Sequence, residues 1–287
     1  MSAPKRTVLI TGCSKGGIGD ALAREFHRQG LRVFATARNL EKVRHLQDAG
    51  IEVLQLDVVD QDSIRNAVAE VSKLTGGTLD ILVNNSGLGY QMPMLDADLD
   101  DARKLFEVNV WAVLAMCQAF TPLLAAGTTE GAPSRILNIG SVCARTNVPW
   151  QGIYNSSKAA VCMLNDNLRI ELSPLGIEVL HVFTGGIRTN FIENSTGTKL
   201  PAGSIYEPVK DIIEADLAGN GSKDQQTMSP DTYAKAVVKN TLSWWPSKTL
   251  WIGGGARSAW LGEHFGTATL MDWSLRNPSL TANHKDP

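Results

Sequence analysis

The fold is decided by the stretch VLITGCSKGGIGDALAREF, Val8 to Phe26, in which an apolar run leads into a glycine cluster and then into a segment of helical period. Ile18, Leu22 and Phe26 are spaced to share one face of a helix, and Gly30 follows where a helix stop is expected. The N–H groups at the start of a helix are free to bind an anion. The order strand, glycine loop, helix therefore predicts a bound pyrophosphate.

Short apolar runs recur along the chain between longer segments of helical period, which is typical of parallel strands joined by crossover helices. The seven runs are TVLI at 7–10, RVFAT at 32–36, IEVLQL at 51–56, LDILVN at 79–84, RILNIG at 135–140, IEVLHV at 177–182 and TLWIG at 249–253. A helix is expected at 63–74, closed by Gly76 and Gly77, and a long apolar helix from about Asp100 to Leu124. The pattern predicts an α/β fold, a doubly wound parallel sheet of about seven strands with helices on both faces.

We expect a single domain at residues 1–275, followed by a polar tail at 276–287. The longest stretch without a strand runs from Asn190 to about Lys248, and four of its apolar residues fall at helical spacing: Val209, Ile212, Ile213 and Leu217. This periodicity predicts an amphipathic flap at about 190–230 over the binding crevice. A peripheral helix that packs for stability alone is the alternative.

Composition excludes several classes of function. The 287 residues carry 27 basic and 29 acidic side chains, a net charge of −2, so the electrostatic footprint of a nucleic-acid binder is missing. The four cysteines form no CxxC pair and no set interleaved with histidines, so neither a metal site nor a disulfide framework is expected.

The sequence also carries an expectation about location. The N-terminus lacks the apolar core of a signal peptide, and no stretch reaches the ~20 uninterrupted apolar residues of a spanning helix. A cytoplasmic protein with a small-molecule partner is expected. The segment WIGGGARSAWLGEHFGTATLMDW at 251–273 is expected in the core or at a subunit contact, with contact to a membrane surface as the alternative.

The candidate catalytic residues share a spacing pattern. Tyr154 and Lys158 form YxxxK, whose i, i+4 relation places both side chains on one helix face. Ser141 lies at the end of the fifth run, thirteen residues before Tyr154, and Asn109 lies in the long apolar helix. A free phenol with a pKa near 10 exchanges protons poorly at neutral pH, and a neighbouring Lys⁺ is expected to lower that pKa. Tyr154 would then exchange a proton with a substrate oxygen while Ser141 hydrogen-bonds that oxygen.

With these motifs the chain resembles the short-chain dehydrogenase/reductase family along nearly all of its length. The glycine loop, LDV at 56–58, NNSG at 84–87 and TGGIRT at 184–189 each match a family motif. The resemblance implies a Rossmann fold and a catalytic tetrad of Asn109, Ser141, Tyr154 and Lys158. It also implies that Lys158 holds the nicotinamide ribose, that Asp57 addresses the adenine ring, and that Asn109 positions a water in a proton relay from Lys158. The residues assigned to the cofactor are Gly12, Ser14, Lys15, Gly17, Ile18, Gly19, Arg38, Asp57, Val58, Asn84, Ser86, Gly87, Tyr154, Lys158, Ile187 and Thr189.

The chain departs from the family pattern in two places. The family loop TGxxxGxG is TGxxxxGxG here, with the surplus residue at Lys15 or Gly16. Thr184 stands where the family has proline, which frees one backbone φ and restores an N–H. The wider loop still predicts a dinucleotide site, because the other motifs independently require a nicotinamide cofactor beside it.

The preferred nicotinamide follows from the second apolar run. Ala37 occupies the position at which NAD-preferring enzymes place Asp or Glu against the ribose hydroxyls. Arg38 follows at once, and its guanidinium suits a 2′-phosphate by charge and by its forked donors. Lys15 adds a second cation in the glycine loop. The sequence thus predicts NADPH/NADP⁺, with two solvated surface charges as the alternative interpretation.

Within the family, the motifs resemble most the fungal branch similar to 1-acyldihydroxyacetone-phosphate reductases and, more remotely, 17β-hydroxysteroid and retinol dehydrogenases. The branch implies reduction of a bulky, apolar or lipidic ketone or aldehyde, or the reverse alcohol oxidation, as in a biosynthetic ketoreductase. Reduction of an acylated dihydroxyacetone phosphate is the first alternative, and a non-catalytic NADP(H)-binding scaffold is the second.

Residues around the predicted crevice are expected to line it or to meet an acidic substrate group: Met92, Met94, Arg145, Val148, Pro149, Trp150, Gln151 and Arg188. The resemblance also implies a homodimer or homotetramer formed through the long apolar helix and the helix that carries Tyr154.

Overall fold

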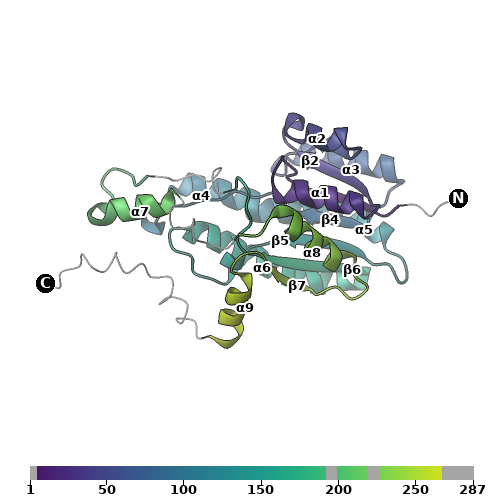
Figure 1. Cartoon of the computed structure of the whole chain (residues 1–287). Coiled ribbons are helices and arrows are strands. Elements are labelled where there is room, and N and C mark those ends of the chain that lie inside the picture. The colour runs from purple at the N-terminus through teal and green to yellow at the C-terminus, as the bar shows by residue number, and fades with distance from the viewer. Residues whose placement is uncertain (1–4, 192–198, 219–226, 267–287) are drawn as a thin grey trace.

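The computed structural model describes residues 5–191, 199–218 and 227–266 (Figure 1). Seven parallel strands form one sheet in the order β3-β2-β1-β4-β5-β6-β7. Their bounds are β1 Thr7–Ile10, β2 Arg32–Ala37, β3 Glu52–Gln55, β4 Ile81–Asn84, β5 Ser134–Ile139, β6 Ile177–Thr184 and β7 Thr249–Ile252. The prediction of a doubly wound parallel sheet of about seven strands is confirmed. Because the strand order reverses between β1 and β4, the binding crevice is expected at the carboxyl ends of these two strands.

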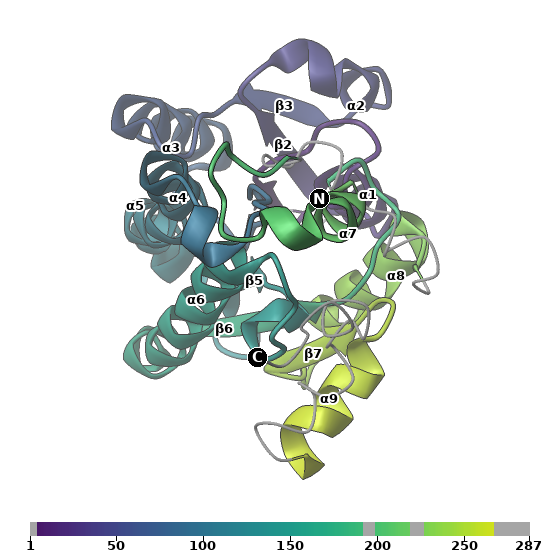
Figure 2. The same cartoon turned by 90° about the vertical axis from the view of Figure 1, so that its left-hand side faces the viewer.

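Helices cover both faces of the sheet (Figure 2). On one face lie α3 Gln61–Thr75, α4 Leu99–Phe106, α5 Ala112–Gly127 and α6 Gly152–Glu171; on the other lie α1 Ile18–Arg28, α2 Arg44–Asp48 and α8 Pro230–Leu242, with α9 Ala256–Phe265 beyond β7. Each face has its own apolar core, one centred on Phe26 and Tyr233 and the other on Phe120 and Val161. Continuous apolar strands are what a sheet covered on both faces requires.

The predicted helix ends are confirmed at two glycines. Gly76 ends α3 with a φ of 76° and donates its N–H to the carbonyl of Ser72. Gly30 follows α1 with a φ of 88°. Both adopt the left-handed conformation that terminates helices and that only glycine adopts without strain.

The long apolar helix is present but is not regular throughout. Leu99–Gly127 contains a π-helical turn at Glu107–Trp111, and Asn109 lies in that turn. By length and composition alone, this helix qualifies as a membrane span. Val113, Met116 and Phe120, however, pack into the core beneath the sheet. The helix is therefore assigned to the core of the fold.

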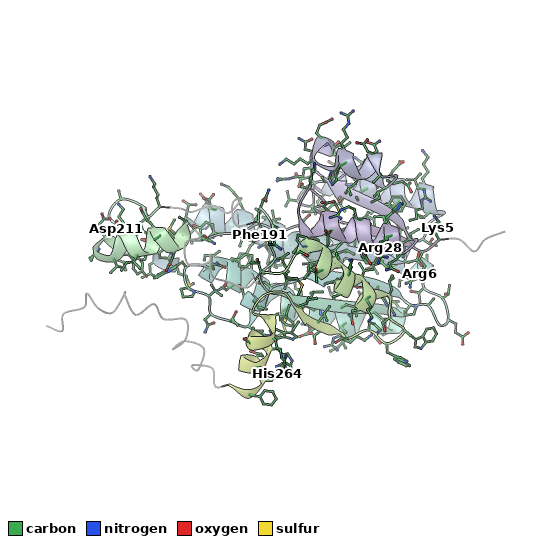
Figure 3. All side chains as sticks on the ribbon, viewed as in Figure 1. Lys5, Arg6, Arg28, Phe191, Asp211 and His264 are labelled. Atoms are coloured by element: carbon green, nitrogen blue, oxygen red, sulfur yellow. The ribbon has the colours of Figure 1, made fainter. Side chains whose placement is uncertain are left out.

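The predicted flap forms a helix, α7 Lys210–Leu217, across the carboxyl end of the sheet (Figures 1 and 2). Ile213 and Leu217 are buried in a third apolar cluster together with Tyr154. Figure 3 shows Asp211 on the far part of this projection and Phe191 nearer the sheet. The amphipathic helix is confirmed; parts of the proposed flap at 192–198 and 219–226, and the proposed tail at 276–287, lie outside the described residues.

Candidate active site

The site is built where β1, β4 and β5 end. The loop after β1 carries the glycine cluster, the segment after β4 carries NNSG, and Ser141 follows β5. Tyr154 and Lys158 face it from α6, one helical turn apart. Asn109 reaches the same place from the π-turn. The topology thus brings the four predicted catalytic residues to one end of the sheet.

The segments that follow β1 and β4 are held together by hydrogen bonds of the Thr11 and Asn85 side chains. The Thr11 hydroxyl accepts the N–H groups of Asn85 and Ser86, each at 2.9 Å. The Asn85 amide donates to the carbonyls of Thr11 and Gly12 at 2.8 and 3.0 Å. Asn85 lies outside the predicted site set, although its place in NNSG marks it. Its contacts make it the link between the glycine loop and the neighbouring strand.

Gly12 and Gly19 are required by this close approach. Gly12 has a φ of 72°, and a Cβ there would lie 2.9 Å from the Ser86 hydroxyl. A Cβ at Gly19 would collide with the Gly12 carbonyl and lie 2.6 Å from the Asn85 amide. Real Cβ atoms essentially never approach other heavy atoms so closely. The two glycines therefore serve the packing of the protein itself as well as access for a phosphate.

The additional residue of the loop is accommodated at its tip. The Lys15 N–H donates to the Lys42 carbonyl at 3.1 Å, and the Gly16 N–H donates to Asp20 Oδ2 at 2.9 Å. Gly16 has a φ of 79° and open space around it. Gly17 caps α1 without a side chain, so the helix N-terminus faces the loop unobstructed by a side-chain cap. The N–H groups of the first turn of α1, together with the open space at Gly16, suit a pyrophosphate.

Asp20 is a residue of this loop that sequence reasoning missed. It is only 4% exposed, and its Oδ1 atom contacts Arg24 Nε at 3.2 Å and His45 Nε2 at 2.9 Å. Asp20 therefore ties the loop tip to α1 and α2 at once. The tip of the enlarged loop is thus held at Gly16 by a carboxylate within the protein.

The predicted 2′-phosphate cations, Lys15 and Arg38, are both exposed near the loop and the end of β2. Asp57 accepts the Val59 N–H at 3.2 Å, which is a turn contact, and Val58 is buried. Ile187 is bridged to Met228 and Thr189 accepts the Phe191 N–H at 3.3 Å.

Asn84 corrects one prediction. Its side chain is buried and donates to Asn138 Oδ1 at 2.9 Å, and Asn138 in turn donates to Asn165. The Asn84 side chain thus joins β4 to β5 and α6 inside the protein instead of facing a cofactor. Its Nδ2 is directed to partners inside the protein, the Asn138 amide and the Cys117 sulfur at 3.4 Å.

Both polar atoms of the Asn109 side chain form hydrogen bonds within the protein. Its Oδ1 accepts the Leu88 N–H at 2.8 Å, and its Nδ2 donates to the Leu88 carbonyl at 3.0 Å and to the Ser157 hydroxyl at 3.1 Å. Ser157 in turn donates to the Tyr154 carbonyl at 2.7 Å. Asn109 therefore positions α6 against the segment after β4. The water-positioning role stays a prediction.

Tyr154 and Ser141 form the polar centre of the site. The Ser141 hydroxyl accepts the Cys143 N–H at 3.1 Å and stands within hydrogen-bonding reach of the Tyr154 phenol. Burial raises the pKa of Tyr154 above its usual value near 10, and the hydrogen bond to Ser141 opposes this rise. Burial also lowers the pKa of Lys158 to about 8.

The expectation that Lys158 lowers the pKa of Tyr154 is therefore wrong for the protein alone. The Lys158 ammonium lies 5.8 Å from the centre of the Tyr154 ring and within 3.4 Å of the Ile139 carbonyl. Because both groups are buried, the dry surroundings favour the neutral form of each. The result is a protonated phenol beside an amine that gives up its charge at mildly alkaline pH.

An apolar wall covers Tyr154 on the side of α7. Tyr90, Met92 and Leu105 meet Ile213 and Leu217 there, with Trp150 and Cys143 packed alongside. The Trp150 indole contacts Tyr206 edge to face at 5.9 Å and donates to Asp216 at 3.3 Å. Phe191 lies 6.0 Å from the Tyr154 ring, centre to centre. The predicted lining role is supported for Met92 and Trp150.

The other residues expected to line the crevice are placed differently. Met94 is 59% exposed, Pro149 is exposed, and Val148 and Gln151 are half-buried. Arg145 contacts Glu263 of α9 at 3.7 Å and Cys162 at 3.6 Å. Its expected contact with an acidic substrate group is not what this geometry favours.

A buried phenol and amine near the carboxyl ends of β1, β4 and β5 place a proton donor beside the crevice in which doubly wound folds bind dinucleotides. The family model described as short chain dehydrogenase matches residues 6–199. The chain therefore belongs to the short-chain dehydrogenase family.

Relatives support this assignment over most of the chain. Short-chain dehydrogenase PC-15 of Penicillium crustosum is 47% identical over 240 residues, which are 83% of this chain and 85% of the relative. The NADPH-dependent 1-acyldihydroxyacetone phosphate reductase of Schizosaccharomyces pombe is 41% identical over 215 residues, 73% of this chain and 70% of the relative. A short-chain dehydrogenase structure from Streptomyces avermitilis superposes with a TM-score of 0.78 at 27% identity, over 96% of this chain and 98% of that one.

Proposed function

We propose that the protein is an NADPH-dependent reductase of a bulky, apolar ketone or aldehyde. The observation that carries this proposal is the burial of the Tyr154 phenol, hydrogen-bonded to Ser141, beneath the apolar wall of α7. A proton donor in such surroundings suits a substrate whose carbonyl is attached to a large hydrocarbon body.

The choice of NADPH rests on three features of the chain. Arg38 and Lys15 are exposed beside the glycine loop, and Ala37 leaves the end of β2 without an acidic side chain. A 2′-phosphate would meet the two cations without repulsion. The fission-yeast relative is itself named as NADPH-dependent. The N-terminus of α1 and the open tip at Gly16 are the groups that would hold the pyrophosphate.

The residues of the site divide the chemistry among them. A bound nicotinamide supplies the hydride that the carbonyl carbon accepts. Tyr154 donates its phenolic proton to the carbonyl oxygen, and Ser141 donates a hydrogen bond to that oxygen as it gains charge. The Lys158 ammonium, 5.8 Å from the centre of the Tyr154 ring, faces the phenolate that remains until a proton returns from solvent.

The test measures NADPH oxidation by the protein with carbonyl compounds of graded size, monitored as the loss of NADPH absorbance. We expect kcat/KM to rise with the apolar area of the substrate, because the α7 wall buries it. Tyr154→Phe should lower kcat by about 10² to 10⁴-fold, the range of general acid catalysis. NADPH binding by this variant is the control for folding. Undiminished turnover by Tyr154→Phe would contradict the proposed proton transfer, and absence of turnover with every carbonyl would favour the scaffold alternative.

A second candidate activity is reduction of an acylated dihydroxyacetone phosphate. It is favoured by the 41% identity to the reductase of Schizosaccharomyces pombe that carries this name. The two candidates differ in their need for the phosphate group. A kcat/KM at least tenfold higher for the phosphorylated substrate than for its dephosphorylated form would establish this second activity. Equal values would leave the general apolar carbonyl reductase.

A further inference from the structure

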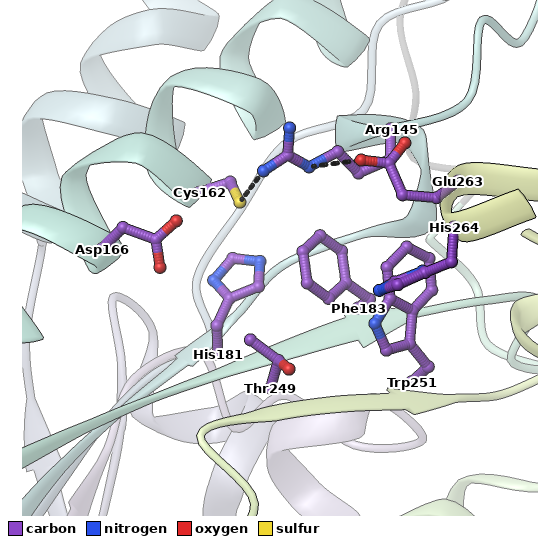
Figure 4. A pocket seen from close by; sticks show the side chains of 9 residues that line it. All are labelled: Arg145, Cys162, Asp166, His181, Phe183, Thr249, Trp251, Glu263 and His264. Atoms are coloured by element: carbon purple, nitrogen blue, oxygen red, sulfur yellow. Dashed lines mark hydrogen bonds and ion pairs between the residues drawn. The ribbon is translucent and has the colours of Figure 1, made fainter. Parts of the chain in front are cut away.

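A cavity lies behind α6, the helix that carries Tyr154 and Lys158, on the side away from α7. It has a volume of about 230 Å³ and opens between α6, β6, β7 and α9 (Figure 4). Neither Tyr154 nor any residue of the predicted cofactor set lines it. The cavity is smaller than the ~300–1,000 Å³ of pockets for drug-sized ligands, so a single-ring molecule is the size that it suits.

His181 of β6 is the polar residue that points to a ligand. Its side chain is 1% exposed, and neither ring nitrogen has a hydrogen-bond partner among residues 5–191, 199–218 and 227–266. Burial lowers the pKa of His181 to about 4, so the ring is neutral at pH 7 and carries one donor and one acceptor. A buried polar atom without a partner is unfavourable, and a ligand hydroxyl at the imidazole would supply the missing partner.

The charged groups around the cavity already have partners. Arg145 contacts Glu263, and Asp166 contacts Arg169 at 3.3 Å. The lining holds the carboxylates Asp166 and Glu263 together with the Arg145 guanidinium. At the imidazole, Lys158 and Arg145 lower the pKa of His181 while Asp166 raises it, so charges of both signs act on the cavity. The electrostatics therefore favour an uncharged ligand.

One wall of the cavity is aromatic. The rings of Phe183 and Trp251 stack at 4.1 Å with their planes 15° apart, and His181 meets Phe183 edge to face at 4.6 Å. His264 contacts Trp251 edge to face at 6.3 Å from α9. Figure 4 shows these rings on one side of the space and the Arg145 guanidinium above it. Such a wall accepts the flat face or the edge of another aromatic ring.

We propose that this cavity is a binding site for a small, uncharged aromatic alcohol of the phenol class. Its ring packs against Phe183 and Trp251, and its hydroxyl exchanges a hydrogen bond with the His181 imidazole. The site is separate from the carbonyl-reducing centre and does not depend on the activity proposed for that centre.

The test is calorimetric titration of the full chain with phenol and, in parallel, with toluene, which has the same shape and no hydroxyl. His181→Phe keeps a ring of similar size and removes both nitrogens. We expect this variant to bind phenol at least tenfold more weakly than the wild-type protein, with toluene binding unchanged. Equal loss of affinity for both compounds, or no loss for phenol, would overturn the role of His181.

A second variant keeps the proposal testable if His181→Phe fails to fold, as judged by circular dichroism. Trp251→Ala removes part of the aromatic wall and should weaken phenol and toluene alike. Trp245→Ala, at a tryptophan that is 85% exposed, is the matched control and should change neither. Phenol binding unaffected by Trp251→Ala would place the ligand elsewhere, including the catalytic centre. No phenol binding up to its solubility, or tighter binding of benzoate than of phenol, would also overturn the proposal.

Discussion

Replacement of Asp20 by asparagine tests how the enlarged glycine loop is held. Asp20 is 4% exposed, and its two oxygens take the Gly16 N–H on one side and Arg24 and His45 on the other. An asparagine has one oxygen, so it satisfies either the loop or the pair of helix residues. Hydrogen bonds to a charged group are worth about 1.5–3 kcal/mol, and each 1.4 kcal/mol is about tenfold in an equilibrium constant.

We therefore expect Asp20→Asn to weaken NADPH binding by about tenfold, because ordering the loop tip is then paid for when the cofactor binds. The measurement is the NADPH dissociation constant from the fluorescence of the bound nicotinamide. Asp62→Asn is the matched control, since Asp62 is a 78% exposed acid paired with Arg65 on α3. An unchanged dissociation constant for Asp20→Asn, with the protein folded, would refute the role assigned to this carboxylate.

Three further predictions concern Arg38, Lys158 and Gly140. Arg38→Asp should reverse the preference in kcat/KM from NADPH toward NADH, and a retained preference for NADPH would contradict the role of this guanidinium. Lys158→Met should be more stable to urea than the wild-type protein at pH 7, where the buried Lys158 ammonium is charged. The unfolded chain holds the Lys158 proton up to about pH 10.5, whereas the folded chain holds it only to about pH 8. The stability advantage of the variant should therefore shrink as the pH rises through that window. Gly140→Ala should lower the free energy of unfolding by about 1–3 kcal/mol, because a Cβ there collides with the His181 imidazole. Adding His181→Ala should restore part of the lost stability. Additive losses of stability in the double-mutant cycle would exclude this contact.

The sheet could be predicted because each buried parallel strand is a short, nearly continuous apolar run. All seven runs became strands, each within two residues of its expected ends. The catalytic set could be predicted because YxxxK is a local pattern, and a helix converts i, i+4 spacing into a shared face. Ser141 and Asn109 were found through their spacing relative to Tyr154.

The contacts that sequence reasoning missed join residues far apart in the chain. The bonds from Asp20 to His45 and from Thr11 to Asn85 span 25 and 74 residues. Nothing in a linear pattern marks such partners before the fold places them together. Asn84 and Arg145 were misplaced for a related reason, since the sequence identifies a polar residue at a strand end without showing on which side its side chain finds a partner.

The direction of the pKa shifts is the part of the site that depends most on burial. A lysine beside a tyrosine suggests a lowered phenol pKa, but burial is the largest cause of both pKa shifts, and Lys158 is not among the causes of the Tyr154 shift. The phenol that results is protonated throughout the neutral range. A group that holds its proton is the form needed to donate to a carbonyl oxygen, whereas alcohol oxidation would begin from the phenolate. Burial therefore keeps Tyr154 in the protonated form that a proton donor requires, which agrees with the carbonyl reduction proposed for this site.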